Sequence, residues 1–392
     1  MEESVIVSAA RTPVGKFGGA FKDVSAVELG AAAIRETVRR SGLSGPSIDL
    51  AIIGQVLQGG CGQAPARQAT LKAGLPREVP AETLNKVCAS SFRAVTLADQ
   101  IIRAGDAEIV LAGGMESMSN APYATANLRW GQRMFNSQML DLMVHDGLWC
   151  PIYDRHMAVH GGKLAKEYGV TREEQDRWAL RSQTLAGQAI ARGVLQEEIV
   201  PVRVVVKKGD SIVSIDETPR ADVTLEGLAK LPPVFSEDNT VTAGNAPGVC
   251  DAGSAILVTS ASRAKREGLT PLATIMRHTF LAEDAAHIAT APGNAINRLL
   301  AKTGMAVQDI DLFEVNEAFA AVVLVSGKIV GWDWNKVNVN GGAIAFGHAI
   351  GATGARIIMT LVFEMRRRRL RHGIAAICSG TGQGDALLVR CD

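Results

Sequence analysis

Short apolar runs alternate with longer amphipathic stretches in the first part of the chain. The apolar runs have strand length and the amphipathic stretches have helical spacing; they are, in turn, residues 5–8, 50–57 and 109–112, and residues 27–39 and 93–103. This alternation predicts parallel βαβ units. The last apolar run is followed by Gly113 and Gly114, where we expect its strand to end.

A different pattern begins near residue 119 and continues to about residue 249. This segment contains most of the tryptophans and tyrosines and many charged residues. Residues 171–191 form one long helical pattern, which starts with a capping box of Thr171 and Glu174. We therefore expect an inserted lobe that covers a site, rather than a further doubly wound layer.

Strand and helix patterns alternate again from about residue 271 and repeat features of the first part. Residues 47–50 (SIDL) recur as 309–312 (DIDL), and residues 110–114 resemble 376–380 at nearly the same separation. The repeats predict an internal duplication; the alternative is chance recurrence of short apolar motifs. The predicted units are an N-terminal half (1–118, with 250–270 returning to it), a loop domain (119–249) and a C-terminal half (271–392).

Composition and charge narrow the classes of partner. The chain has 392 residues, of which 47% are hydrophobic, and this is enough for an extensive core. Its 41 Lys and Arg residues nearly balance 40 Asp and Glu, so no net field attracts nucleic acid or an acidic membrane. The basic run at 366–369 closes an apolar helical pattern, where cations are favourable. We expect no nucleic-acid partner.

The sequence also argues against membrane, export and metal signals. No apolar stretch approaches the ~18 residues of a membrane span, and the acidic start is unlike a signal peptide. The six scattered cysteines predict reduced thiols and a cytoplasmic location. His156 and His160 stand four residues apart, but without an HExxH pattern or a third ligand we expect no metal.

Residues 85–91, NKVCASS, place a cysteine directly before an amphipathic helix. The free amide groups and positive dipole at a helix N-terminus stabilise a thiolate, which predicts a lowered pKa for Cys88. A reactive nucleophile is one interpretation. A buried structural cysteine is the other, and it is the more common one for an arbitrary cysteine.

Residues 338–348, NVNGGAIAFGH, embed a histidine in a glycine-rich loop. The glycines permit a close approach of the backbone to a ligand or to another strand. His348 is suited to accept a proton from a thiol, because a neutral imidazole is available near pH 7. A phosphate loop is the alternative, but the glycine spacing matches neither of its common patterns.

Residues 375–384, AAICSGTGQG, carry a strand into a second cysteine and a run of glycines. Too few residues follow for the helix and strand of a dinucleotide-binding unit. We therefore expect the glycines to expose Cys378 and to present N–H donors to a substrate oxygen. In residues 316–320 (NEAFA), Asn316 either orients a water or an oxygen, or caps a helix.

Two cysteines, a histidine and an asparagine on separate loop tips form a candidate constellation. Cysteine and histidine suffice for acyl transfer. A second cysteine is unnecessary for hydrolysis. It becomes useful if the acyl group passes to a carbon, because forming that carbanion requires another base.

These four segments resemble the thiolase family, and the resemblance extends over essentially the whole chain. The central lobe is similar to the loop domain of biosynthetic acetoacetyl-CoA thiolases. The resemblance implies a thiolase-like, five-layered αβαβα fold of two duplicated halves with an inserted loop domain. The further matching stretches are 8–13 (SAARTP), 113–119 (GGMESMS), 131–132, 156–157, 174–176 and 242–245 (TAGN).

By this resemblance the chain is an acyl-CoA C-acyltransferase that condenses two acetyl-CoA molecules to acetoacetyl-CoA and CoA, or catalyses the reverse thiolysis. Cys88 would carry the acetyl group, and His348 would accept its proton. With a water held by Asn316, His348 would form one oxyanion hole, and the N–H groups of Cys88 and Gly380 a second. Cys378 would remove the α-proton of the second acetyl-CoA. Two holes are needed because charge develops on two thioester oxygens in a ping-pong reaction.

The resemblance also implies where CoA lies and how the chain assembles. CoA would lie under the loop domain with Arg220 near its phosphates; CoA is a substrate and product, and no cofactor is expected. A homotetramer is expected, with a dimer as the alternative, because the segment near 127–136 resembles a tetramerisation loop. The expected lining of the pantetheine or acyl channel is Leu148, His156, Met157, Phe235, Ala243, Ala318 and Phe319.

Several positions depart from the family pattern without replacing a residue expected to touch a reacting atom. They bear on acyl-chain preference and CoA contacts. They are Ala349 for a proline, Ser91 and Ala158 for glycines, Pro247 and Gly227 for serines, Ile288 for a methionine, and Thr381, which is typical of the fatty-acid-degrading branch.

Three alternatives compete with the acetyl-specific assignment. The nearest is a 3-ketoacyl-CoA thiolase of broader chain length. A ketoacyl synthase also uses a cysteine on a related architecture, but it pairs that cysteine with a different base set, and Cys378 argues against it. An inactive acyl-CoA-binding scaffold is disfavoured because Cys88, Asn316, His348 and Cys378 occur together.

Overall fold

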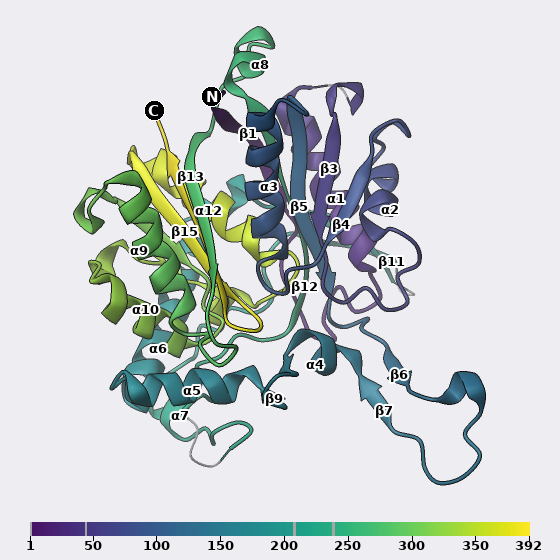
Figure 1. The fold of residues 1–392 in the computed structure, drawn as a ribbon, viewed down its shortest axis with the longest axis vertical. Coiled ribbons are helices and arrows are strands. Elements are labelled where there is room, and N and C mark those ends of the chain that lie inside the picture. Colours follow the sequence, from purple (N-terminus) through teal and green to yellow (C-terminus); the bar gives the residue numbers. More distant parts are fainter. Residues whose placement is uncertain (1, 44, 207–208, 237–239) are drawn as a thin grey trace.

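Figure 1 shows the computed structural model, which describes residues 2–43, 45–206, 209–236 and 240–392. The strands of its main sheet come from both ends of the chain. They are β1 (Ser4–Arg11), β2 (Gly15–Lys16), β3 (Leu50–Gly54), β4 (Ala81–Leu84), β5 (Ile109–Ser117), β12 (Cys250–Ser260), β13 (Ala273–Ala282), β14 (Leu312–Val315), β15 (His372–Ser379) and β16 (Gln383–Arg390).

Within the described residues these ten strands form one mixed sheet. Its order is β14-β15-β16-β13-β1-β12-β5-β3-β4, and β2 pairs with β12. Three register pairs at the start of β1 and β13 join its two parts. Among the described strands, parallel pairing is confined to β3–β4, β3–β5 and β14–β15. The predicted parallel units are therefore confirmed at these pairs, whereas β1, β12 and β5 run antiparallel to one another.

Helices cover and separate the two parts of this sheet. α1 (Ala26–Ser41) and α2 (Pro65–Lys72) lie on the first part, and α9 (Ala291–Thr303), with α10 (Ala320–Val330) against it, lies on the second. α3 (Ser90–Ala104) and α12 (Thr353–Arg368) pack against each other between the two parts (Figure 1). This order of helix, sheet, helix, sheet, helix confirms the predicted α/β fold with five layers.

Two equivalent aspartates support the predicted internal duplication. The Asp49 carboxylate accepts hydrogen bonds from two consecutive backbone N–H groups at the start of β5, both at 2.9 Å. The Asp311 carboxylate accepts two in the same way at the start of β15, also at 2.9 Å. Asp49 precedes β3, which runs parallel to β5, and Asp311 precedes β14, which runs parallel to β15. The repeated SIDL and DIDL motifs thus perform the same structural task in the two halves.

The predicted end of one strand is wrong for a reason that matters at the site. β5 does not end at Gly113 and Gly114 but continues through them to Ser117. The glycines serve close packing instead, because a Cβ on Gly114 would lie 2.0 Å from the carbonyl oxygen of Gly351. A strand can therefore pass directly under the loop that carries His348.

The central lobe contains short strands and two longer helices. The Thr171–Glu174 capping box predicted at the start of α6 is present. The division into domains at 119 and 249 stays a prediction. The elements of this segment are β6 (Tyr123–Thr125), η2 (Leu128–Trp130), β7 (Met139–Asp141), α4 (Leu142–Gly147), β8 (Trp149–Cys150), β9 (Arg155–His156), α5 (Met157–Glu167), α6 (Arg172–Ala191), η3 (Val194–Glu197), β10 (Val202–Val206), β11 (Gly209–Val213) and α7 (Leu225–Ala229).

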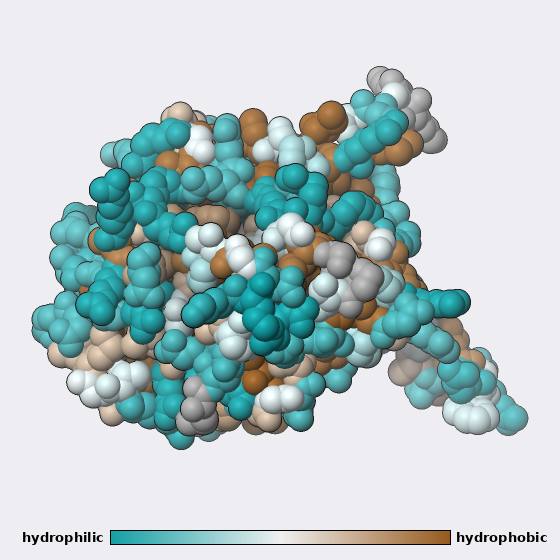
Figure 2. All heavy atoms as spheres, turned by 90° about the horizontal axis from the view of Figure 1, so that it is seen from above, coloured by the Kyte–Doolittle hydropathy of each residue, from teal (hydrophilic) through white to brown (hydrophobic). Residues whose placement is uncertain are grey.

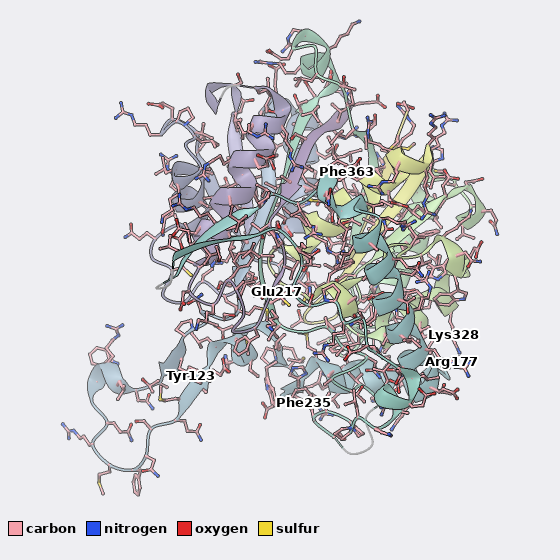
Figure 3. The ribbon with its side chains drawn as sticks, turned by 180° about the vertical axis from the view of Figure 1, so that it is seen from behind. Tyr123, Arg177, Glu217, Phe235, Lys328 and Phe363 are labelled. Carbon is pink, nitrogen blue, oxygen red and sulfur yellow. The ribbon has the colours of Figure 1, made fainter. Side chains whose placement is uncertain are left out.

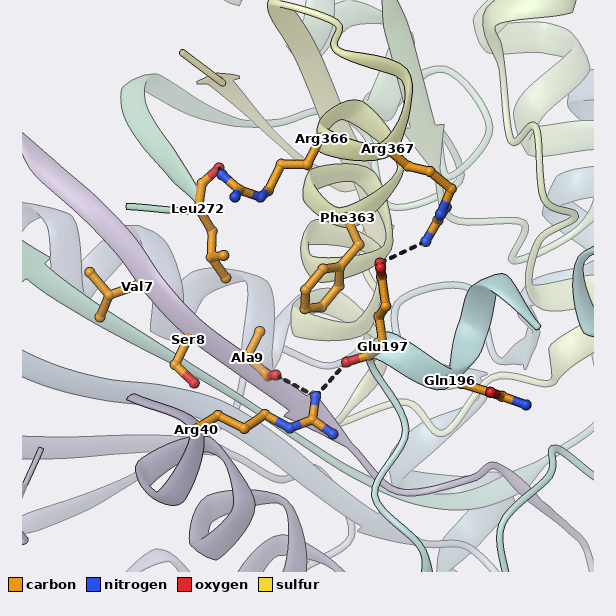
Figure 4. A pocket seen from close by; sticks show the side chains of 10 residues that line it. All are labelled: Val7, Ser8, Ala9, Arg40, Gln196, Glu197, Leu272, Phe363, Arg366 and Arg367. Carbon is orange, nitrogen blue, oxygen red and sulfur yellow. Dashed lines mark hydrogen bonds and ion pairs between the residues drawn. The ribbon is translucent and has the colours of Figure 1, made fainter. Parts of the chain in front are cut away.

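Arginines fasten this lobe to both halves of the body. In a hollow of about 670 Å³, Arg40 of α1 donates to the carbonyl oxygens of Ala9 and Glu197, and Arg367 of α12 donates to the Glu197 carboxylate (Figure 4). Two residues after Ala9, the fully buried Arg11 pairs with Glu198 at 2.8 Å and with Asp216 at 2.7 Å. These contacts keep the lobe in one position over the body.

The middle layer depends on an unusually close crossing of α3 and α12. A Cβ on Gly354 would lie 2.2 Å from the backbone nitrogen of Phe92, so only glycine fits between these helices. Next to it, the Ser91 hydroxyl accepts a hydrogen bond of 3.0 Å from the backbone N–H of Ala355. Ser91 therefore caps α12 from another helix, which accounts for one departure from the family pattern.

The surface differs between the body and one projecting arm. The face in Figure 2 carries mainly hydrophilic side chains with hydrophobic ones interspersed. β6 and β7 project from the body as an arm (Figure 1), with Tyr123 at its base (Figure 3). In the part of the chain that the structure describes, no helix is long and apolar enough to cross a bilayer.

We expect Gly354→Ala to destabilise the fold by about 2–3 kcal/mol, because the added methyl group forces α3 and α12 apart. Gly187→Ala is the matched control. Gly187 lies in α6 with nothing within 4 Å of an added Cβ, so this change should stabilise by about 0.5–1 kcal/mol. Urea unfolding of both variants checks this; an unchanged midpoint for Gly354→Ala would contradict the tight crossing.

Candidate active site

Four predicted residues meet at the end of the middle layer. Cys88 directly precedes α3, His348 precedes α12, Cys378 lies at the end of β15, and Asn316 follows β14. All four are buried, with exposed fractions between 0% and 6%. Asn316 Nδ2 lies 3.4 Å from His348 Nε2, and Cys88 and His348 line the same cavity. The duplicated halves thus bring separate loop tips to one point.

Cys88 lies at the helix N-terminus as predicted, but its predicted low pKa is wrong. Burial raises the pKa of the Cys88 thiol to about 12, outweighing hydrogen bonds from the N–H groups of Cys88 and Gly380, which lower it. Desolvation therefore exceeds the helix-end effect. The thiol is uncharged at rest, and a base must remove its proton when it reacts.

His348 is the neutral base beside this thiol. Burial, assisted by the positive charge of Arg356, lowers the pKa of His348 to about 3, so the imidazole is uncharged near neutrality, as predicted. Its Nδ1 lies 2.8 Å from Thr353 Oγ1, and that hydroxyl donates its proton to the carbonyl oxygen of Ala349 at 2.8 Å. Thr353 can then only accept from Nδ1–H. We infer that Nε2 carries the free lone pair.

The second cysteine lies in a hairpin rather than a dinucleotide-binding turn. β15 and β16 pair antiparallel across it, with Cys378 opposite Gly384. Burial and the neighbouring Cys88 raise the pKa of Cys378 well above its usual value. The turn directs the N–H of Gly380 at the Cys88 sulfur. The prediction that the glycines expose Cys378 is wrong, because this thiol is fully buried, whereas the predicted presentation of an N–H donor agrees with the position of Gly380.

A cavity of about 320 Å³ leads from Cys88 and His348 to the surface under the lobe. Its wall is mainly apolar and includes Ile288 and Pro247, two of the departures from the family pattern. Seven predicted contact residues line it: Leu148, His156, Met157, Phe235, Ala243, Ala318 and Phe319.

Arg220 lies in a neighbouring, more polar hollow of about 540 Å³, which also contains Lys16 and Gln183. The two hollows share Ala243, Ala246, Gly248 and Val249 as a common wall. The structure therefore places an apolar channel beside a polar hollow that is lined by two cations, Lys16 and Arg220, and by Glu217. A ligand with a narrow apolar arm and a charged head fits this layout.

His156 contributes to the channel as a neutral aromatic group. Burial lowers the pKa of His156 to about 4. Its Nδ1 accepts the N–H of Ala158 at 3.1 Å, and its ring stacks on Phe235 at 3.8 Å. Phe235 is 61% exposed and lies at the lower edge of the body (Figure 3). The pair forms one lip of the channel.

Two buried carboxylates that were not predicted hold the loops of the site. Glu317 accepts from Trp178 Nε1, Ser182 Oγ, Asn338 Nδ2 and the N–H of Ile344, at 2.7–3.0 Å. These bonds join the lobe to the loop that precedes His348. The sequence signal was an acidic residue within the apolar NEAFA segment.

The second carboxylate, Glu116, lies in the apolar GGMESMS segment. Burial raises its pKa to about 7. It accepts the N–H groups of Val56, Leu57 and Gly351 at 3.0–3.2 Å. Val56 and Leu57 are therefore withdrawn from the sheet, and β3 ends at Gly54 rather than at the predicted residue 57. Thr353, whose hydroxyl contacts the His348 ring, is a further residue of the site that no sequence pattern identified.

Comparisons with known proteins agree on one family. A family model described as "Thiolase, N-terminal domain" matches residues 4–262, and one described as "Thiolase, C-terminal domain" matches residues 269–391. Proteins named acetyl-CoA acetyltransferase from Pseudomonas aeruginosa and Cupriavidus necator are 48% and 49% identical, with 99–100% of each chain covered. A crystal structure of the Bacillus anthracis acetyl-CoA acetyltransferase superposes with a TM-score of 0.97 at 41% identity, covering 100% of this chain and 99% of that one.

We expect acid to weaken the folded state partly through His348. Its pKa in the folded chain, about 3, lies below the unfolded value of about 6.5, so the unfolded state binds the extra proton as the pH falls below 6.5. At pH 5 this should remove ~2 kcal/mol from the unfolding free energy. Urea unfolding at pH 7 and pH 5 should show a smaller loss for His348→Asn than for wild type. The exposed-site control His145→Asn should keep the full loss; an equal loss in all three would contradict the assignment.

Proposed function

The chain belongs to the thiolase family, and from this we propose that it transfers an acetyl group between CoA thioesters with formation or cleavage of a carbon–carbon bond. The observation that carries the proposal is the meeting of a buried thiol, Cys88, and a neutral imidazole in an apolar channel, with the second buried thiol, Cys378, next to Cys88. One thiol can hold an acyl group while the other acts on a carbon acid.

In the first half-reaction, Cys88 attacks the thioester carbon of acetyl-CoA. His348 Nε2 accepts the thiol proton as the bond forms, and it returns that proton to the departing CoA sulfur. The N–H groups of Cys88 and Gly380, which already point at the Cys88 sulfur, lie where an acyl oxygen on that sulfur needs donors. An uncharged imidazole with a free Nε2 suits this transfer.

In the second half-reaction, His348 Nε2 accepts the thiol proton of Cys378, and the resulting thiolate removes a proton from the α-carbon of a second acetyl-CoA. His348 Nε2–H, which now carries the Cys378 proton, and a water oriented by Asn316 donate hydrogen bonds to the enolate oxygen. Asn316 Oδ1 has no hydrogen-bond partner within the described residues and can hold that water. The carbanion attacks the acetyl carbon on Cys88; the carbon–carbon bond forms and the bond to sulfur breaks. His348 gives its proton to the released Cys88 sulfur, and Cys378 keeps the proton taken from the α-carbon. Thiolysis is the reverse.

CoA itself is the substrate and product, and no further cofactor enters these steps. We place its pantetheine arm in the apolar channel and its phosphates by Arg220 in the polar hollow. Pro247, where a serine is common, lines the channel and offers no hydroxyl to the pantetheine amides. The six cysteines are all free thiols, which supports the proposed cytoplasmic location.

We expect Cys88→Ala to lose both acyl exchange and thiolysis, and Cys378→Ala to lose thiolysis while Cys88 can still be acetylated. Intact-mass measurement after incubation with acetyl-CoA should show one acetyl group on wild type and on Cys378→Ala. Cys61→Ala is a control, because Cys61 lies outside the channel. Wild-type protein that gains no acetyl group and does not cleave acetoacetyl-CoA would contradict the proposal.

The same assay separates the acetyl-specific enzyme from a broader 3-ketoacyl-CoA thiolase. Ile288 is buried at the channel wall, where it limits the space beside the acyl group. Rates should fall from acetoacetyl-CoA to longer 3-ketoacyl-CoA substrates. Equal or higher rates on long chains would favour the broader assignment.

We further propose that the arm formed by β6 and β7 assembles the chain into a homotetramer. Four large side chains on it are exposed, which is unfavourable in an isolated chain: Leu128 (54%), Trp130 (87%), Met134 (69%) and Phe135 (90%). Light scattering of a Trp130→Ser, Phe135→Ser variant should show a dimer that keeps thiolysis activity. A wild type that is already a dimer would contradict the tetramer.

A further inference from the structure

One residue joins the two segments that carry the thiols. Lys86 lies two positions before Cys88 and makes two contacts with the β15–β16 hairpin. Its carbonyl oxygen accepts from Ser379 Oγ at 2.5 Å, and its Nζ donates to Asp385 Oδ2 at 2.6 Å. In the hairpin, Asp385 is paired with Ile377, directly before Cys378, and Ser379 directly follows it. The two contacts therefore bracket Cys378.

The turn between Lys86 and Cys88 is strained and needs such support. Val87 has φ +46°, in the left-handed region that β-branched residues rarely adopt. Local hydrogen bonds hold it: the Val87 N–H donates to Asn85 Oδ1 at 2.9 Å, and Ser90 Oγ donates to the Val87 carbonyl oxygen at 2.6 Å. Val87 also faces Gly380, since a Cβ there would lie 3.2 Å from a Val87 methyl group. A shift of Lys86 would therefore move Val87, which adjoins Cys88, and also disturb its contact with Gly380 in the hairpin.

The ion pair is shielded from solvent. The side chains of Lys86 and Asp385 are 17% and 1% exposed. Lys86 Nζ also lies 5.4 Å from the centre of the Phe280 ring, and the guanidinium of Arg93 lies 5.6 Å from the same ring. A shielded pair of this kind holds a defined geometry. Removal of Lys86 takes away the hydrogen-bonded ammonium of Asp385, although the positive charge of Arg93 remains near that carboxylate.

We propose that Lys86 and Asp385 are positioning residues that set the spacing between Cys88 and Cys378 for the carbon–carbon step. This inference rests on the proposed function. Acetylation of Cys88 uses Cys88 and His348 and takes from the hairpin only the N–H of Gly380. The carbon–carbon step also needs Cys378 to reach the α-carbon of a second thioester while the acetyl group occupies Cys88. Loosening the link therefore affects the second half-reaction more than the first.

The test measures the two half-reactions separately in Lys86→Met, Asp385→Asn and Lys86→Arg. Exchange of labelled CoA into acetyl-CoA reports acetylation of Cys88, and cleavage of acetoacetyl-CoA reports the carbon–carbon step. In Lys86→Met and Asp385→Asn, exchange should stay within about 3-fold of wild type, whereas cleavage should fall by about 10- to 100-fold, as expected for a small misplacement of a reacting group. Lys86→Arg keeps the charge and should recover most of the cleavage rate.

Arg103→Met is the matched control. Arg103 pairs with Asp99 at 2.8 Å near the other end of α3, with side chains that are 21% and 3% exposed. This variant should lose thermal stability without changing the ratio of cleavage to exchange. An equal fall of both rates in Lys86→Met and Asp385→Asn, or a ratio unchanged as in Arg103→Met, would overturn the positioning role. Absence of both reactions in wild type would instead overturn the proposed function.

Discussion

The close crossing of α3 and α12 is the contact on which the rest of the site depends. Cys88 and His348 each precede one of these helices, so the distance between the helices also fixes the nucleophile relative to its base. Gly354 and Gly114 permit backbone to approach backbone there, where any side chain would be excluded. The duplication supplies one such helix from each half. A fold built of two similar units thus obtains two different reacting groups at one place.

Burial of this crossing also determines the electrostatics. Thiols and imidazole are all uncharged in the resting site, because desolvation outweighs the nearby N–H donors. Proton transfer to His348 is then part of the reaction and not a property of the resting site. The charged groups nearby have structural contacts. Glu317 accepts hydrogen bonds from the lobe and from the loop that precedes His348. The Lys86–Asp385 ion pair links the segments that carry the two cysteines.

The sequence was sufficient for the features that depend on local pattern. The α6 capping box, the strand and helix alternation and the loop-tip cysteines follow from residue type and spacing, and the resemblance supplied the channel residues. Features that depend on tertiary burial were not predictable. The pKa of Cys88 reverses direction once the thiol is desolvated, and β3 ends early because Glu116 captures two of its N–H groups. Thr353 acquires its importance only when the chain folds back on the His348 ring.

The apolar wall of the channel has a consequence for the lifetime of an acyl-enzyme. A thioester on Cys88 would lie at the end of a passage lined by Leu148, Met157 and Phe319, with few groups that can hold or activate water. Thr353 holds the His348 ring through Nδ1, and Nε2 faces Asn316 Nδ2 at 3.4 Å. Loss of the acetyl group to solvent would then be slow compared with its capture by an incoming thioester. The same side chains that shape the channel for pantetheine would thereby conserve the energy of the thioester until an acceptor arrives.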